Sequence, residues 1–253
     1  VYSNVDSIIT EDTPRLLDIS KDLEYLSTDE YALTKARQEN LLKENTKNNW
    51  TIIRPYITYS HNRLQLGILE KEEWLYRTLK GRTIVFSKEM MSKQTTLTYG
   101  LDVSKGIKAI MGKRDAMNRA FHITQSTAVS WEEVLDVYKQ TIKNAYNLDV
   151  KVKLLYLSDF MNIAPRKAQI KYDRLYDRVF DNSNINQFIS TEEWMTPLAG
   201  IEENLKRFLA HPDFLKINWG SEAVKDKYTN EFSKLNEIES LKTKLKYLIK
   251  RFK

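Results

Sequence analysis

A helix followed by a polar break and a short apolar strand is the feature that most limits the fold of this chain. Helical spacing and a cap at Ser27 or Thr28 predict a helix that continues to about Lys47. Asn48-Asn49 breaks it, and residues 50–53 then indicate a buried strand, which Arg54-Pro55 ends because proline cannot donate to a ladder. This order is half of a βαβ unit, so the predicted fold class is α/β with a parallel sheet.

The alternation of helices and strands continues to the end of the chain. Strands are expected at residues 83–86, 95–99, 121–123 and 150–157, and helices at about 64–80, 102–111, 198–209 and 222–252. A further helix begins after Ser130, where Glu133 three residues later completes a capping box.

Composition excludes several classes of protein and of site. A hydrophobic share of 42% and a charged share of 29% belong to a folded chain rather than a disordered one. No apolar run is long enough to span a membrane. With no cysteine, disulfides and thiol nucleophiles are excluded, and with three histidines no metal site is expected. The seven glycines form no cluster, so the chain has no glycine-rich phosphate loop.

Much of the excess positive charge, +6 overall, lies near the end of the chain. The helix expected there has apolar residues at heptad-like spacing, with lysines on its other faces: Ile238, Leu241, Leu245, Leu248 and Phe252. This pattern favours a helix that packs on its own domain or on a second copy. The alternative is a basic amphipathic helix with weak affinity for an anionic membrane surface. No nucleic-acid partner is expected, because the charge belongs to one helix rather than to a binding face.

Tyr31 and Lys35 are the candidate catalytic residues. They are four residues apart, so on a helix they project from one face about one turn apart. A phenol is a poor base near neutral pH, and a neighbouring ammonium favours its phenolate form. Such a phenolate could exchange a proton with a substrate hydroxyl or carbonyl while hydride moves. The same spacing also occurs by chance in ordinary helix-surface pairs, so its meaning depends on context.

That context is a series of motifs in a fixed order. The series runs Val1-Tyr2, Ile9–Pro14, Tyr31-x-x-x-Lys35, Ile52–Tyr59, Leu101–Ile107 and Ala120–Ile123. It resembles the extended short-chain dehydrogenase/reductase family, which comprises nucleotide-sugar epimerases and dehydratases. The resemblance covers about residues 1–145 and is specific in order and spacing, although each motif alone is modest.

The resemblance implies roles for the residues at matching positions. Tyr31 would be the catalytic acid and base, and Lys35 its partner, which also contacts the cofactor, NAD or NADP. Arg54, Pro55 and Tyr56 would lie beside the nicotinamide. The family's catalytic serine or threonine and its glycine-rich loop would precede Val1, so the chain is expected to begin part-way through a Rossmann domain.

Candidate contacts of a nucleotide-sugar substrate are Arg63, Thr95, Arg174 and Arg178. The family's arginine that pairs with the diphosphate is replaced near Thr95, and Arg63, Arg82 or Lys93 would supply that charge instead. Arg174 and Arg178 are four residues apart and would form a two-pronged diphosphate clamp. The alternative is a solvent-exposed helix on which Asp and Arg side chains form ion pairs four residues apart.

Two interleaved domains are expected. Residues 1–60 and 99–125 would form the rear part of the NAD(P)-binding Rossmann domain, and residues 61–98 and 126–220 would form a smaller α/β substrate domain. Residues 221–253 would add a basic C-terminal helix.

The expected function is that of an NAD(P)-dependent epimerase, dehydratase or reductase of nucleotide sugars, in surface-polysaccharide or sugar-nucleotide biosynthesis. The expected form is a cytoplasmic homodimer. A non-catalytic binding or scaffold protein with this fold is the alternative. The altered loop at Ser60–Arg63 favours that alternative, and the intact pair of Tyr31 and Lys35 disfavours it.

Overall fold

Two compact units divide the chain, and each consists of three separate segments. The computed structural model describes residues 2–5 and 8–252, so Val1, with which the first motif begins, lies outside them. The first unit comprises residues 1–60, 93–129 and 168–200, and the second comprises residues 61–92, 130–167 and 201–253. Both contain parallel strand pairs and helices, so the predicted α/β class is confirmed.

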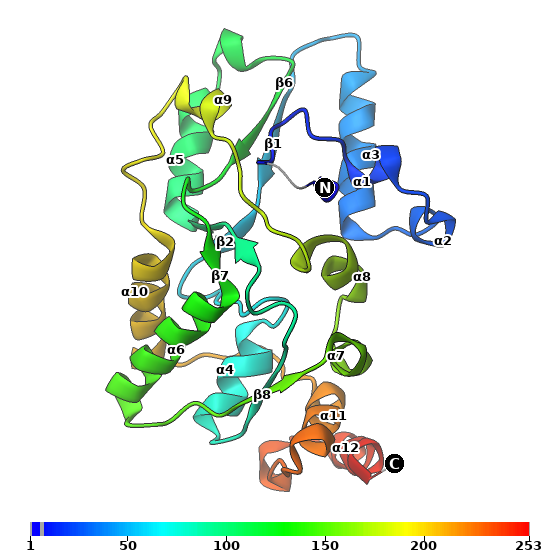
Figure 1. Cartoon of the computed structure of the whole chain (residues 1–253), viewed down its shortest axis with the longest axis vertical. Coiled ribbons are helices and arrows are strands. Elements are labelled where there is room, and N and C mark those ends of the chain that lie inside the picture. Colours follow the sequence, from blue (N-terminus) through cyan, green and yellow to red (C-terminus); the bar gives the residue numbers. More distant parts are fainter. Residues whose placement is uncertain (1, 6–7, 253) are drawn as a thin grey trace. The chain divides into compact units, whose positions relative to one another are not determined.

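The first unit is built around two parallel strand pairs. β1 (Thr51–Pro55) pairs with β6 (Arg119–Ile123), and β2 (Ile57–Tyr59) pairs with β5 (Leu97–Tyr99). Figure 1 shows α3 (Tyr31–Lys43) and α5 (Gly100–Ile110) on opposite sides of the pair formed by β1 and β6. The unit is completed by short elements: α1 (Leu16–Ile19), α2 (Leu23–Leu26), β4 (Gln94–Thr95), α8 (Lys167–Gln169), a π-helical turn (Ile170–Arg174) and α9 (Ser183–Asn186).

Helix α3 begins two or three residues later than the sequence predicts. The Thr28 hydroxyl donates to the carbonyl of Tyr25 at 2.7 Å, so it closes the preceding helix instead of opening the next one. The Glu30 carboxylate accepts from the backbone N–H of Ala32 at 2.8 Å and takes the capping role. An acidic cap also suits the positive end of the helix dipole. The first helical residue is therefore Tyr31.

Residues 168–200 belong to the first unit, so the segment 126–220, expected as one part of a substrate domain, is divided between both units. The backbone explains this division. The N–H of Ile9 donates to the carbonyl of Val179, and the N–H of Asp181 donates to the carbonyl of Ile9. These bonds form a parallel bridge between Ile9 and Phe180, which ties the later segment to the start of the chain.

The second unit contains a parallel pair of strands, β3 (Ile84–Ser87) and β8 (Val152–Leu155). Its helices are α4 (Lys71–Leu79), α6 (Trp131–Tyr146), α7 (Leu157–Ile163), most of α10 (Pro197–Ala210), α11 (Trp219–Thr229) and α12 (Leu241–Phe252). Short β7 (Val129–Ser130) precedes α6. The predicted capping box is confirmed, because the Ser130 hydroxyl accepts from the N–H of Glu133 and the Glu133 carboxylate accepts from the N–H of Ser130.

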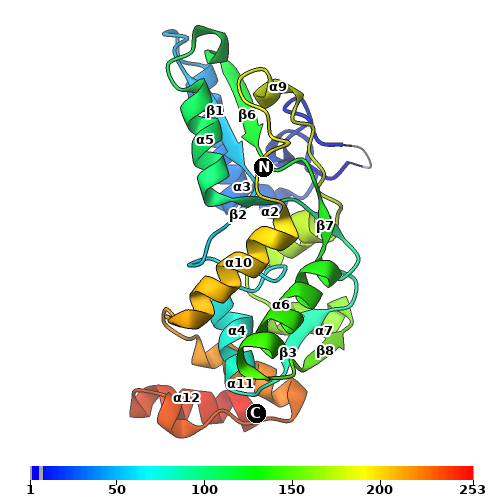
Figure 2. The same ribbon diagram turned by 90° about the vertical axis from the view of Figure 1, so that its left-hand side faces the viewer.

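The long helix predicted over residues 222–252 is wrong. Asn230 adopts a left-handed conformation with φ 55° and ends α11, and α12 begins only at Leu241 (Figure 2). The Asp226 carboxylate accepts from the backbone N–H and the hydroxyl of Ser233, which holds the chain in the turn between the helices. Within residues 2–5 and 8–252, no helix combines the length and apolar character that crossing a bilayer requires.

Candidate active site

Tyr31 and Lys35 lie together on the outward face of α3, as their spacing predicts. Tyr31 is the first residue of the helix and is 65% exposed. The Lys35 ammonium lies 5.7 Å from the centroid of the Tyr31 ring and donates to the side-chain oxygen of Gln38 at 3.1 Å. A phenol beside an ammonium, both open to solvent, can exchange a proton with a bound hydroxyl group.

The inward face of α3 determines how this pair is oriented. Leu33 packs with Leu16 and Tyr25 in an apolar cluster, and Ala36 is also buried. The third buried position of this helix is Glu39, a carboxylate. Since Lys35 and Glu39 are four residues apart, rotation of the helix about its axis would disturb both.

Glu39 is held by two arginines inside the unit. Arg54 donates to both carboxylate oxygens, from Nε at 2.8 Å and from Nη2 at 2.7 Å. Arg15 Nη1 donates to the same carboxylate at 3.1 Å and to the carbonyl of Ala36 at 3.0 Å. Burial alone would raise the pKa of Glu39, but the hydrogen bonds and charge of Arg54 and Arg15 outweigh it and hold that pKa below its usual value.

Arg54, expected at the cofactor, therefore lies inside the unit. Its remaining nitrogen, Nη1, donates to the Tyr2 hydroxyl and to the carbonyl of Glu11, both at 3.0 Å. All three guanidinium nitrogens donate to protein acceptors, so Arg54 links α3 to the end of β1. Of its two sequence neighbours, Pro55 is exposed at the end of β1 and Tyr56 is half-buried.

The buried network continues to His122 on β6. The Tyr2 hydroxyl lies 3.4 Å from His122 Nδ1, and His122 Nε2 donates to the carbonyl of Asp181. The backbone N–H of His122 donates to Glu11 at 3.1 Å. This pattern fits a neutral imidazole with its proton on Nε2. Burial lowers the pKa of His122 and, by disfavouring the phenolate, raises the pKa of Tyr2 to about 12.

Arg174 and Arg178 do not form a clamp on one helix. The helical turn ends at Arg174, and both guanidinium groups are buried and paired with the carboxylate of Asp173. Arg178 also donates to the backbone carbonyls of Ser3 at 2.8 Å and Tyr172 at 2.7 Å. The alternative of a solvated helix is wrong as well, because burial is deep enough to lower the pKa of Arg178.

Tyr56 joins this second polar cluster. Its hydroxyl donates to Asp173 at 2.8 Å and accepts from Arg174 Nη1 at 3.2 Å, and its ring packs against Phe180 with 5.0 Å between centroids. Tyr56 therefore connects the segment after β1 to the segment 168–200 within the first unit.

Thr95 and Arg63 belong to different units. Thr95 is buried in β4, beside the strand-like segment of Arg178, whose N–H donates to the carbonyl of Gln94. Its hydroxyl has no hydrogen-bond partner among the residues that the structure describes. Arg63, in the second unit, is exposed and lies 3.8 Å from the carboxylate of Glu70.

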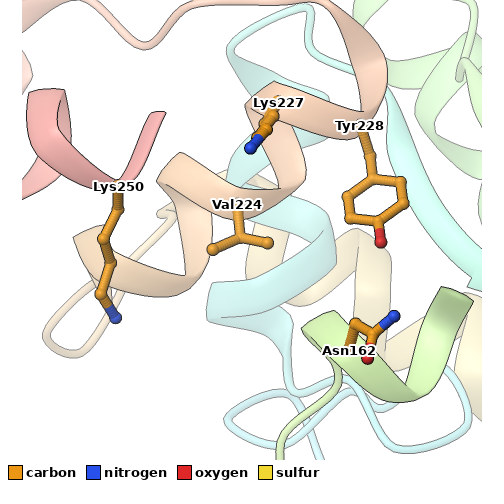
Figure 3. Close-up of a pocket in the computed structure, with 5 residues that line it drawn as sticks. All are labelled: Asn162, Val224, Lys227, Tyr228 and Lys250. Atoms are coloured by element: carbon orange, nitrogen blue, oxygen red, sulfur yellow. The ribbon is translucent and has the colours of Figure 1, made fainter. Parts of the chain in front are cut away.

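No group of three or more metal-ligating side chains gathers in the described part of the chain. Two open hollows lie away from Tyr31 and Lys35. One, of about 550 Å³, lies in the second unit between α7, α11 and α12 and is lined by Asn162, Val224, Lys227, Tyr228 and Lys250 (Figure 3). The other, of about 460 Å³, lies in the first unit along α5. Neither contains a candidate site residue.

Several solved structures are similar to this chain, whereas no family model and no curated protein matches it. One is the UDP-glucuronic acid 4-epimerase from Bacillus cereus, in complex with UDP-glucuronic acid and NAD. It has 15% sequence identity and a TM-score of 0.58, over 83% of this chain and 58% of that one. This chain thus spans less than two thirds of the epimerase.

Two further structures show that proteins of different description share the fold. The terminal R domain of the myxalamid PKS-NRPS pathway is 18% identical, with a TM-score of 0.55 over 86% of this chain and 57% of that one. A short-chain dehydrogenase/reductase superfamily protein from Agrobacterium tumefaciens with bound NAD is 14% identical, with a TM-score of 0.53 over 81% and 61%. The fold of this chain is the Rossmann-type fold of these proteins.

Proposed function

We propose that this chain carries the proton-transfer residues of an NAD(P)-dependent epimerase, dehydratase or reductase that acts on a nucleotide sugar. The observation that carries the proposal is the exposed pair of Tyr31 and Lys35 on α3. The similarity to an epimerase with NAD and UDP-glucuronic acid bound supports the cofactor and the substrate class. A role in sugar-nucleotide or surface-polysaccharide biosynthesis, in a cytoplasmic homodimer, is part of the proposal.

In the proposed mechanism Tyr31 acts as base and then as acid. Its phenolate takes the proton of a sugar hydroxyl as the carbon of that hydroxyl is oxidised to a ketone, and it returns the proton when a ketone is reduced. Lys35 stabilises the phenolate by its charge. When bound, NAD or NADP supplies acceptance and return of the hydride.

Lys35 also fits a nicotinamide cofactor. An ammonium has three N–H donors, and one of them is directed to Gln38 in the structure. The others would donate to the ribose hydroxyls, beside the exposed ring of Tyr31. Pro55 and Tyr56, at the end of β1, would flank the nicotinamide. Arg54 would act on the site only through Glu39, because its own donors are bound within the unit.

The candidate substrate-contacting residues fall into two groups, one exposed and one buried. Arg63 is exposed and would meet the diphosphate of the nucleotide sugar. Arg174 and Arg178 are paired with Asp173, so they would hold the segment 168–200 in position rather than bind the diphosphate directly. Thr95, whose buried hydroxyl has no hydrogen-bond partner among the described residues, would shape the same part of the first unit.

The test compares the variants Tyr31→Phe and Tyr156→Phe, both made in the full-length protein. Tyr156 is a matched control, since it is 63% exposed and has the ammonium of Lys88 5.2 Å from its ring. UDP-sugars would be supplied with NAD or NADP, and products followed by NMR. Loss of general acid–base catalysis should lower kcat by about 10²–10⁴-fold in Tyr31→Phe, while Tyr156→Phe retains wild-type kcat.

The same experiment examines the scaffold alternative. If the wild type converts no sugar and forms no reduced cofactor, and Tyr31→Phe binds nucleotide sugars as the wild type does, the protein is a binding protein rather than an enzyme. Lys35→Met separates the two roles of the lysine, because it should raise the KM for the cofactor as well as lower kcat.

A further inference from the structure

Helix α12 leaves an apolar face exposed at the end of the second unit. The exposed fractions of its four side chains are 73% for Leu241, 53% for Leu245, 54% for Ile249 and 70% for Phe252. At 100° per residue these four positions fall within one narrow arc of the helix. The ring of Phe252 also lies 6.2 Å from that of Phe232, which is 45% exposed, so the apolar surface extends beyond the helix.

The opposite face of α12 holds the helix firmly on its own unit. Tyr247 is fully buried against Trp219, Ala223 and Ile238. Its hydroxyl donates to the carboxylate of Asp226 at 2.6 Å and accepts from the N–H of Ser233 at 2.7 Å. The exposed arc therefore belongs to a packed helix and not to a helix end that is loosely attached.

The charges of α12 all have one sign. Residues 241–252 contain five basic side chains and no acidic one: Lys242, Lys244, Lys246, Lys250 and Arg251. By helical spacing Lys242 and Lys246 follow one edge of the apolar arc and Lys244 lies beyond the other edge. The nearest acidic residue in sequence, Glu239, is exposed just before the helix.

The hollow of about 550 Å³ adds to this positive surface. Lys250 of α12 and Lys227 of α11 both line it, with Val224 between them and Tyr228 and Asn162 at its other end (Figure 3). Two ammonium groups and a phenol hydroxyl are groups that bind phosphate oxygens. The hollow therefore provides a place for an anionic headgroup beside the helix.

We propose that α12 binds the surface of an anionic membrane, with its axis in the plane of the bilayer and its apolar arc among the lipid chains. Lysine side chains at the edges of such an arc can extend their ammonium groups to lipid phosphates while their methylenes stay in apolar surroundings. Each such ammonium group near an anionic surface strengthens binding through its charge. A second copy of this chain is a poorer occupant, because a two-fold contact would bring five basic side chains against five others.

The test measures co-sedimentation of the whole chain with phosphatidylcholine vesicles that contain or lack phosphatidylglycerol. Point variants are needed, because deletion of residues 222–253 would also remove Asp226 and Glu231, which bind Arg77 in the core of the unit. The wild type should sediment with the anionic vesicles only, and less so at high salt. The double variant Leu245→Ser/Ile249→Ser should bind at least about tenfold more weakly, since it removes the apolar contribution.

Charge and apolar controls come from the first unit. Lys242→Gln/Lys246→Gln/Lys250→Gln should weaken binding by roughly tenfold or more. The control variants Lys21→Gln/Lys43→Gln/Lys47→Gln and Leu23→Ser/Leu41→Ser replace side chains that are also exposed and should bind as the wild type does. Circular dichroism melts would verify that every variant is folded.

Three results would overturn the proposal. They are equal sedimentation with neutral and anionic vesicles, equal weakening by the first-unit controls, and wild-type binding by Leu245→Ser/Ile249→Ser. A dimer that dissociates in that double variant, without vesicle binding by the wild type, would assign the face to a second copy instead. None of these results bears on the proposed hydride-transfer function, which is tested separately through Tyr31.

Discussion

At the scale of single residues, Glu39 joins helix α3 to strand β1. It accepts hydrogen bonds from Arg54 and Arg15, and all three side chains are buried. Glu39→Gln would leave the buried guanidinium of Arg54 without a counter-charge, while Arg15 would keep Asp18 as its partner. We expect it to lower the free energy of unfolding by about 3 kcal/mol, as measured by urea unfolding. Glu44→Gln, at the exposed end of the same helix, is the control and should have little effect.

The direction of the pH dependence follows from the lowered pKa of Glu39. Its stabilising effect is complete above the pKa of an unfolded glutamate, about 4.3, and is lost as the pH falls through the lower folded value. The free energy of unfolding should therefore decline more steeply with acid in the wild type than in Glu39→Gln. If the free energy of unfolding fell equally steeply with acid in both proteins, Glu39 would not be the source of this pH dependence.

His122 should introduce a second pH dependence nearer neutrality. Burial lowers its folded pKa, so as the pH falls below about 6.5 the unfolded chain binds a proton that the folded chain does not. Stability should fall over this range in the wild type, and His122→Gln should remove that part of the decline. His211→Gln, at an exposed position, should leave the decline unchanged. The readout is urea unfolding at a series of pH values.

At the scale of elements, Arg77 of α4 holds the end of the chain in place. It donates to Glu222 and Asp226 of α11, both at 2.8 Å, and to Glu231 at 3.2 Å. Arg77→Met would leave the buried carboxylate of Asp226 without a counter-charge, although Glu222 would keep Lys225, and should destabilise the protein by about 3–5 kcal/mol. Limited proteolysis should then cut first between α11 and α12. Arg207→Met, at an exposed position on α10, should be cut as slowly as the wild type.

At the scale of the whole molecule, each unit has its own buried ion cluster, one at Glu39 and one at Arg77. Calorimetry should resolve two unfolding transitions, one for each unit. Glu39→Gln should lower one midpoint and Arg77→Met the other, each by about 10 °C. A single transition that both variants lower equally would mean that the units unfold as one.

Features that depend on neighbouring residues could be predicted from the sequence, and features that depend on distant ones could not. The capping box at Ser130 and the exposed pair of Tyr31 and Lys35 follow from local spacing, and both are present. The break at Asn230 was not predictable, because Asp226 holds Ser233 through side-chain bonds that no helical periodicity reveals.

The arginines illustrate the same limit within the candidate site. The resemblance placed Arg54 at the cofactor, but its partner Glu39 lies fifteen residues earlier on another element. Arg178 is buried because the carbonyl of Ser3, 175 residues away, accepts from it. Charge and spacing suggested a diphosphate ligand at Arg174 and Arg178, whereas the role of Arg54 beside the nicotinamide rested on the resemblance alone. Only the tertiary fold shows which acceptors within the protein each guanidinium binds.

The interleaved segments of the two units also determine the order in which they can be completed during synthesis. The first unit needs residues 168–200, which contribute the partners of Ile9 and Ser3, so it cannot close until most of the chain has left the ribosome. The second unit needs residues 201–253 and closes later still. A nascent chain that has been synthesised only as far as residue 92 therefore holds parts of both units and the whole of neither, and it must be kept from aggregation until the later segments arrive.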